Sequence, residues 1–169
     1  MTNRNVVFIA PSELAFVRVT GPYAASSVAA WARLLDWMAQ RGHAAPDEVG
    51  FGLALDDPRT TLPELLRYDA CVKRPTTFSD DDISIVTLKQ FHGGAYFKTP
   101  HRGSYQMLGR AVSLARNELL PREGLMHDAT RPVLTLNYSY PSTTLPEDQF
   151  AEICIPVFPD RRLMPRDDA

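Results

Sequence analysis

The sequence predicts an α+β fold in which a ββαββ unit occurs twice with pseudo-two-fold symmetry, forming an antiparallel sheet and two main helices. Two observations lead to this prediction. The pentapeptide TTLPE stands at residues 60–64 and again at 143–147, and a Gly-x-Tyr element stands at 21–23 and again at 103–105. A duplicated unit with one single-residue insertion or deletion explains both.

The first repeat is expected at about residues 6–75, and its elements follow from periodicity and turn signals. Residues 23–40 are expected to form a helix, because apolar residues recur there at helical spacing and Gly42 follows as a stop signal. Pro11 and Ser12 separate two short apolar runs before this helix, and the TTLPE block separates two more after it. The strands of this repeat are therefore expected at 6–10, 14–20, 51–55 and 66–73.

The second repeat is expected at about residues 83–158, after a linker at 76–82, with the same order of strands and helix. Its helix is expected at 104–119, ended by Pro121. Its strands are expected at 83–88, 95–99, 133–138 and 150–157, with a turn at the two glycines 93 and 94. We thus expect one domain over residues 1–159 and a charged tail at 160–169.

The composition of the chain argues against several classes of protein. The 169 residues carry 18 Lys and Arg against 20 Asp and Glu, and this net charge of −2 disfavours direct binding of nucleic acid. No apolar run is long enough to span a membrane or act as a signal peptide, and two cysteines are too few to staple the domain. The four histidines lack metal-ligand spacing, and no phosphate-binding loop occurs. We expect a cytoplasmic, bacterial-type protein without a metal or cofactor.

Strand alternation singles out two acidic residues. In the strand at 150–157, Ile153 and the other odd-numbered residues are expected to face the helices, which leaves Glu152 on the opposite face. In the strand at 66–73, the same alternation places Asp69 on that opposite face, at the position equivalent to Glu152.

The two carboxylates differ in their local sequence. Arg67 stands two residues from Asp69 on the same face, so we expect a structural salt bridge there. The strand around Glu152 supplies no Lys or Arg, and its nearest same-face neighbour is Phe150. An unpaired carboxylate in apolar surroundings needs a polar partner or a ligand, and both a structural and a functional role stay open for Glu152.

Aromatic residues are the second group of candidates, because a carboxylate beside aromatic faces suits a cation with an apolar body. Ordinary core packing is the alternative for each of them. Trp37 lies off the helical stripe that contains Trp31, so we expect it at a cleft edge or a partner surface, whereas Tyr68 and Tyr138 have core parity. The candidates are Trp31, Trp37, Tyr68, Phe91, Tyr96, Tyr105 and Tyr138.

Several motifs together resemble one family. AFVR at 15–18, GPY at 21–23, DDP at 56–58, RYDACV at 67–72 and EICIP at 152–156 occur in the order typical of the GyrI-like, or gyrase-inhibitor-like, small-molecule-binding domain. The resemblance covers about residues 6–158. The same domain forms the effector-binding half of AraC-type and multidrug-responsive transcription regulators.

The resemblance implies a ligand cleft at the junction of the repeats, with Glu152 in it and lipophilic, often cationic ligands. It also implies that some similar proteins hydrolyse strained cyclopropane-bearing toxins, with an acidic residue that activates water, and that others bind DNA gyrase. The sequence departs from the family pattern at Ser104, which replaces a proline, and at Thr135, where many relatives carry a second glutamate.

Three functions follow as hypotheses. The first is a stand-alone protein that binds a lipophilic, cationic or electrophilic compound, with Glu152 as the acidic anchor. The second is a hydrolase of electrophilic toxins in which Glu152 is the general base. The third is a protein-binding modulator, for example of DNA gyrase or of a regulator protein. A DNA-binding regulator is least favoured, because the two repeats occupy almost all of the 169 residues.

Overall fold

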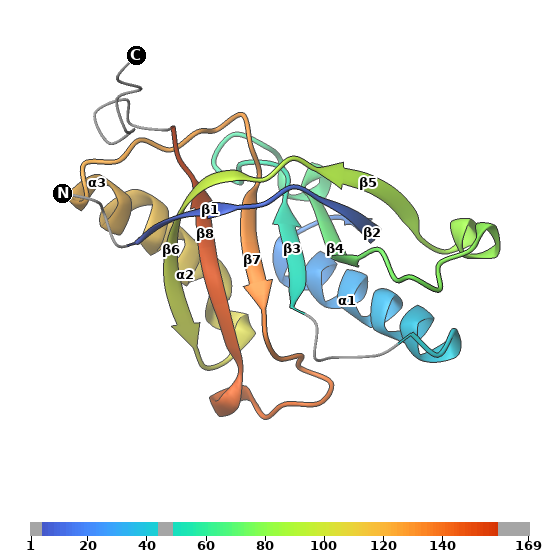
Figure 1. Ribbon diagram of the computed structural model, residues 1–169. Helices are drawn as coiled ribbons and strands as arrows, with labels where there is room; N and C mark the ends of the chain where they lie inside the picture. Colours follow the sequence, from blue (N-terminus) through green and yellow to red (C-terminus); the bar gives the residue numbers. More distant parts are fainter. Residues whose placement is uncertain (1–4, 44–48, 159–169) are drawn as a thin grey trace, which may run out of the picture.

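One curled antiparallel sheet and two main helices make up the fold (Figure 1). The computed structural model describes residues 5–43 and 49–158. In these residues the eight strands are β1 (Val6–Ile9), β2 (Ser12–Thr20), β3 (Gly50–Ala54), β4 (Arg67–Lys73), β5 (Thr87–Phe91), β6 (Gly94–Arg102), β7 (Val133–Asn137) and β8 (Phe150–Pro156). The main helices are α1 (Tyr23–Gln40) and the segment that begins with α2 (Leu108–Leu114). The predicted α+β class is confirmed.

Both helices cover the same face of the sheet, and the alternation predicted for β4 and β8 is confirmed. Helix α1 packs on Ala70 and Val72 of β4, whereas α2 and the turns after it pack on Ile153 and Ile155 of β8. The other face of the sheet carries its own apolar cluster, which includes Cys71 and Cys154 and side chains from the outer strands β1, β2, β5 and β6. The curl of the sheet therefore buries a core that no helix covers.

Each half of the chain contributes its first strand to the other half. The strand order is β1-β6-β8-β7-β3-β4-β2-β5, so β1 pairs with β6 and β5 pairs with β2. The two halves meet at the β3–β7 pair, where Gly52 lies opposite Thr135. With β1 to β4 taken as equivalent to β5 to β8, this order reads the same from both edges. It is compatible with the predicted duplication, and a two-fold relation of the halves stays a prediction.

The first helix has the predicted limits, and Gly42 ends it with a φ of 66°. The second helix differs from the prediction. A 3₁₀ turn (Tyr105–Met107) precedes α2, and a π-helical turn (Ala115–Leu119) and the short α3 (Leu120–Arg122) follow it. Pro121 does not end the helix, which continues to Arg122 and is followed by Gly124 with a φ of 71°.

The strand predicted at 83–88 is wrong in its first half. Residues Asp80–Ser84 form a 3₁₀ helix, and β5 begins at Thr87. The cause is a capping box, in which the Asp82 carboxylate accepts a hydrogen bond from the backbone N–H of Ser79. Asp82 is buried, although it stands at the end of the stretch predicted to be a linker.

The tail predicted at 160–169 lies outside the described residues. None of the helices in the described parts of the chain combines the length and the apolar character needed to cross a membrane.

Candidate functional site

Glu152 projects from β8 on the face away from the helices and has two polar partners. Lys98 of the neighbouring strand β6 places its Nζ 2.8 Å from Oε1, and the Tyr138 hydroxyl donates a hydrogen bond of 2.7 Å to Oε2. The Tyr138 ring stacks on Phe150 with a centroid distance of 5.3 Å. The guanidinium carbon of Arg102 lies 4.5 Å from the Phe150 centroid. We call Glu152, Tyr138, Phe150 and Lys98 the Glu152 cluster.

The charge state of this cluster follows from its contacts. Burial tends to raise the pKa of Glu152, but the hydrogen bonds from Lys98 and Tyr138 and the charge of Lys98 outweigh burial and lower it. Burial raises the pKa of Tyr138, and its hydrogen bond to Glu152 adds to this effect. Glu152 is therefore an anion near neutral pH, and a weak base.

Glu152 has a cationic partner, which its own strand does not show, because the β6–β8 register brings Lys98 opposite Cys154. One prediction about this cluster is wrong. Tyr138 is not a core residue, since it is 43% exposed and follows β7 on the face opposite the one predicted. The alternation within β6 places Lys98 on one face with Tyr96. The sequence alone, however, does not indicate which strand lies next to β8.

Asp69 occupies the corresponding position of β4 and forms a closed ion cluster. Its side chain is 0% exposed and accepts hydrogen bonds of 2.7 and 2.9 Å from the Arg18 guanidinium and another from Lys89 of β5. The Lys89 ammonium also lies 4.5 Å from the centroid of the Phe16 ring. We call Asp69, Arg18, Lys89 and Phe16 the Asp69 cluster.

The predicted partner of Asp69 was wrong, although a structural salt bridge does form. Arg67 pairs instead with Asp56, with Nη2 and Oδ1 2.7 Å apart. Arg18 lies directly opposite Asp69 in the β2–β4 register. Residues directly opposite across an antiparallel pair lie closer together than residues two apart in one strand, so Arg18 has the geometric advantage.

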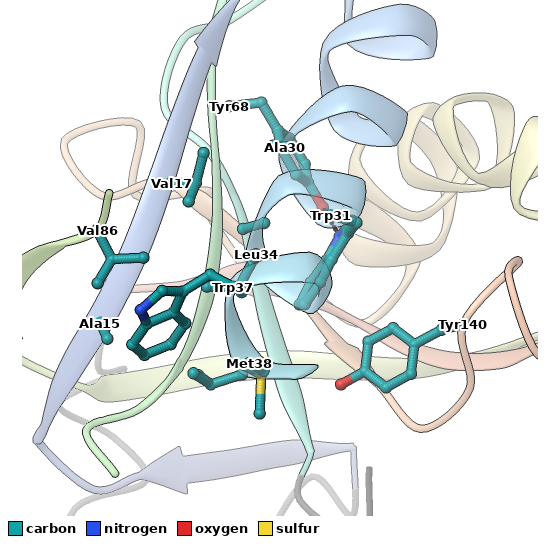
Figure 2. Close-up of a cluster of buried hydrophobic side chains, with 12 residues drawn as sticks. Ala15, Val17, Ala30, Trp31, Leu34, Trp37, Met38, Tyr68, Val86 and Tyr140 are labelled. Atoms are coloured by element: carbon teal, nitrogen blue, oxygen red, sulfur yellow. Dashed lines mark hydrogen bonds between the residues drawn. The ribbon is translucent and has the colours of Figure 1, made fainter. Parts of the chain in front are cut away.

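A second polar group lies on the helix face, at the junction of the two halves. The Trp31 indole N–H donates a hydrogen bond of 3.0 Å to the Tyr68 hydroxyl within the core below α1 (Figure 2). A Cβ on Gly52 would come within 2.2 Å of this hydroxyl and 2.5 Å of the Thr135 Oγ1, so only glycine leaves room for both groups. Asn137 is also buried on β7, and its Oδ1 has no hydrogen-bond partner among the described residues.

The remaining predicted residues have structural contacts. Trp37 is a core residue, because the 3₁₀ segment at 80–84 covers it and Asp82 accepts a 3.0 Å hydrogen bond from its indole N–H. It also borders a surface hollow between α1 and β2. Phe91 and Tyr96 are buried in the cluster on the face without helices. The Tyr105 hydroxyl donates to the backbone carbonyl of Phe150.

The predicted aromatic residues thus lie on both faces of the sheet. Two surface hollows lie on the helix side of the molecule, and Glu152 lines neither of them. One, of about 420 Å³, lies between α1 and β2 and includes Arg18, Arg33 and Trp37. The other, of about 440 Å³, runs along α2.

Comparisons with known proteins identify a family from the sequence and a shared fold from the structure. The family model for the GyrI-like small molecule binding domain matches residues 3–157. The C-terminal domain of EcmrR superposes with a TM-score of 0.66 at 14% identity, over 90% of this chain and 95% of that one. SAV2435 bound to tetraphenylphosphonium gives a TM-score of 0.57 at 13% identity, over 90% and 92%. A hydrolase from Listeria innocua gives 0.58 at 18% identity, over 90% of each chain.

Proposed function

Because the chain belongs to the GyrI-like small-molecule-binding domain family, we propose that it binds a lipophilic cation with Glu152 as the acidic anchor. The observation that carries this proposal is the Glu152 cluster itself. It combines an anionic carboxylate, 17% exposed, with the stacked rings of Tyr138 and Phe150. A cation with an apolar body is attracted both by the carboxylate and by the faces of such rings.

Lys98 is the group that a ligand has to displace. Its side chain is 34% exposed, and a pair of this kind contributes at most about 1 kcal/mol, so the lysine can swing into water when a better cation arrives. The Asp69 cluster supports the same chemistry, because there a carboxylate and an aromatic ring hold two cationic groups of the chain itself. The tetraphenylphosphonium bound by the structural neighbour SAV2435 is a lipophilic cation of the proposed class.

Calorimetric titration with tetraphenylphosphonium tests the proposal. Glu152→Gln keeps the shape of the side chain and removes its charge, so we expect about tenfold weaker binding or more. Glu147→Gln is the matched control, since Glu147 is exposed in the β7–β8 loop, and it should bind like the wild type. Lys98→Met removes the competing cation and should tighten binding. Equal affinities for the wild type and Glu152→Gln would refute Glu152 as the anchor.

The helix-face junction is the alternative location for the same ligand. The orphaned Oδ1 of buried Asn137 and the polar group around Tyr68 favour it as a second candidate. Tyr68→Phe and quenching of tryptophan fluorescence distinguish the two locations, because Trp31 donates its hydrogen bond to Tyr68, whereas neither tryptophan belongs to the Glu152 cluster. Loss of binding in Tyr68→Phe together with unchanged binding in Glu152→Gln would assign the ligand to the junction.

A hydrolase is the second candidate function, because two structural neighbours from Listeria innocua are described as hydrolases. The lowered pKa of Glu152 opposes the role of a general base, which works best with a pKa near the working pH. Mass spectrometry of an electrophilic substrate incubated with wild type and Glu152→Gln separates the two functions. Product formed by the wild type alone would support hydrolysis. A protein partner such as DNA gyrase stays a prediction.

A further inference from the structure

Two arginine side chains from different halves of the chain converge on one neutral acceptor. Asn117 lies in the π-helical turn after α2, and its Oδ1 is 3.3 Å from Nε of Arg116 and 3.4 Å from Nη1 of Arg59, in the β3–β4 loop. Asn117 itself is exposed. An amide oxygen that two guanidinium groups share is a weak substitute for an anion.

The charges around this point are unbalanced. Asp57 forms an ion pair with Arg59, with Nη2 of Arg59 2.7 Å from Oδ2 of Asp57. The other oxygen of Asp57, Oδ1, lies 3.9 Å from Nη1 of Arg116, which is beyond hydrogen-bond distance. The Arg116 side chain is only 7% exposed, and burial and the charge of Arg59 lower its pKa. The single negative charge of Asp57 therefore balances only one of the two guanidinium charges.

The surrounding groups do not remove the excess of positive charge. His127 is close enough that burial and the charges of both arginines lower its pKa, and its Nε2 is buried with no hydrogen-bond partner in the described part of the chain. The other nearby carboxylates have cations of their own, since Glu118 pairs with Arg122 and Asp128 pairs with Arg131.

A hollow of about 440 Å³ leads along α2 to the same point. Met107, Ala111 and Leu114 line it at helical spacing, and Asn117 lies at its end. Met107 and Leu114 are both nearly half exposed, so their apolar surface is accessible from the hollow. We call this hollow the α2 groove. Its remaining lining consists of His101, Arg110, Ser113 and Glu118.

We propose that the α2 groove binds a small amphipathic oxyanion, a carboxylate or a phosphate monoester. The oxyanion takes the place of the Asn117 amide between Arg59 and Arg116, and the apolar body lies along Met107, Ala111 and Leu114. The π-helical turn supports this assignment, because such turns widen a helix locally and occur frequently at functional sites. The proposal is independent of the cation site at Glu152, which lies on the other face of the sheet.

Titration with phenyl phosphate, followed by calorimetry and by the imidazole NMR signals of His127, tests the groove. The wild type should bind, and a bound anion should raise the pKa of His127 because it offsets the charges of the arginines. Arg59→Met should bind about tenfold more weakly. Arg74→Met is the matched control, because Arg74 is also an exposed arginine with one carboxylate partner, Glu13, and it should leave binding unchanged.

Leu114→Glu offers a second variant at an exposed position, where folding is retained, and its charge in the groove should abolish binding. Benzoate and inorganic phosphate are the comparison ligands. Binding of benzoate would support the proposed oxyanion chemistry. Its affinity relative to that of phenyl phosphate shows whether the groove prefers a carboxylate or a phosphate monoester. Inorganic phosphate that binds as tightly as phenyl phosphate would overturn the role of the apolar stripe. Absence of phenyl phosphate binding to the wild type, or equal affinity in Arg59→Met, would overturn the site.

Discussion

The Asp69 cluster and the Glu152 cluster occupy corresponding places in the two halves of the chain. Each carboxylate projects from the last strand of its half, on the face without helices, and a buried cysteine follows two residues later. Burial raises the pKa of both thiols, Cys71 and Cys154, to about 12. Around the carboxylates the halves differ, because Asp69 is fully buried between Arg18 and Lys89, whereas Glu152 is partly exposed with one lysine and one tyrosine.

The residue directly opposite each carboxylate accounts for the difference. In the β2–β4 register Asp69 faces Arg18, and in the β6–β8 register Glu152 faces Pro100. Proline offers neither a charge nor a hydrogen-bond donor, so the second carboxylate has to find a cation further along the strand or in solution. One strand position can therefore hold a permanent internal ion cluster or stay available to a ligand, and the neighbouring strand decides which.

The largest expected effect is a difference in the loss of stability when the carboxylate of each cluster is replaced by an amide. Asp69→Asn leaves two cations beside a buried neutral amide and should lower the free energy of unfolding by about 3 kcal/mol. Glu152→Gln should lower it by less than about 1 kcal/mol, because its partners are partly exposed. Urea unfolding followed by circular dichroism measures both changes. Similar losses in the two variants would contradict the contrast between a closed and an open cluster.

A smaller effect is expected when Pro100 is changed to make the second cluster resemble the first. Pro100→Arg places a guanidinium opposite Glu152, where it should compete with an added cation and weaken tetraphenylphosphonium binding about tenfold. Pro100→Gln replaces the proline by a polar side chain without a charge and is the control, with binding close to that of the wild type. Unchanged affinity in Pro100→Arg would show that the opposite residue does not control access to Glu152.

The smallest expected effect is the pH dependence of the Glu152 cluster. The pKa of Glu152 is lower in the folded chain than in the unfolded one. The contribution of its charge to stability is therefore present above the unfolded pKa of about 4.3 and is lost as the pH falls through the folded pKa. The difference in unfolding free energy between wild type and Glu152→Gln should therefore be at most about 1 kcal/mol at pH 7 and should shrink towards zero as the pH falls through the folded pKa of Glu152. Urea unfolding across this range measures it. A difference independent of pH would mean that the carboxylate charge contributes nothing.

Local patterns predicted much of the fold. The helix at 23–40 and the faces of β4 and β8 followed from periods of 3.6 and 2 residues, which a single segment displays by itself. The partners of the carboxylates could not be predicted in this way. Arg18 and Lys98 reach Asp69 and Glu152 only through strand pairing between residues that are far apart in the sequence.

The burial of Trp37 has the same physical origin. Helical spacing placed Trp37 beside the apolar stripe of α1, but its cover comes from a 3₁₀ segment more than forty residues later, whose Asp82 accepts the indole hydrogen bond. Tyr138 continues the regular alternation of β7, because Leu134 and Leu136 also lie on the face without helices. Alternation separates the two faces of a strand, but it does not show which of them the helices cover.

The exchange of first strands between the halves has a consequence for synthesis on the ribosome. Strand β2 lacks one of its two neighbours until β5 has been made, and β1 has no partner until β6 follows it. The first half therefore emerges with unpaired strand edges, which can pair with other chains. These pairings close long loops, which slows folding. The protein cannot complete its first half before its second half has begun to leave the exit tunnel.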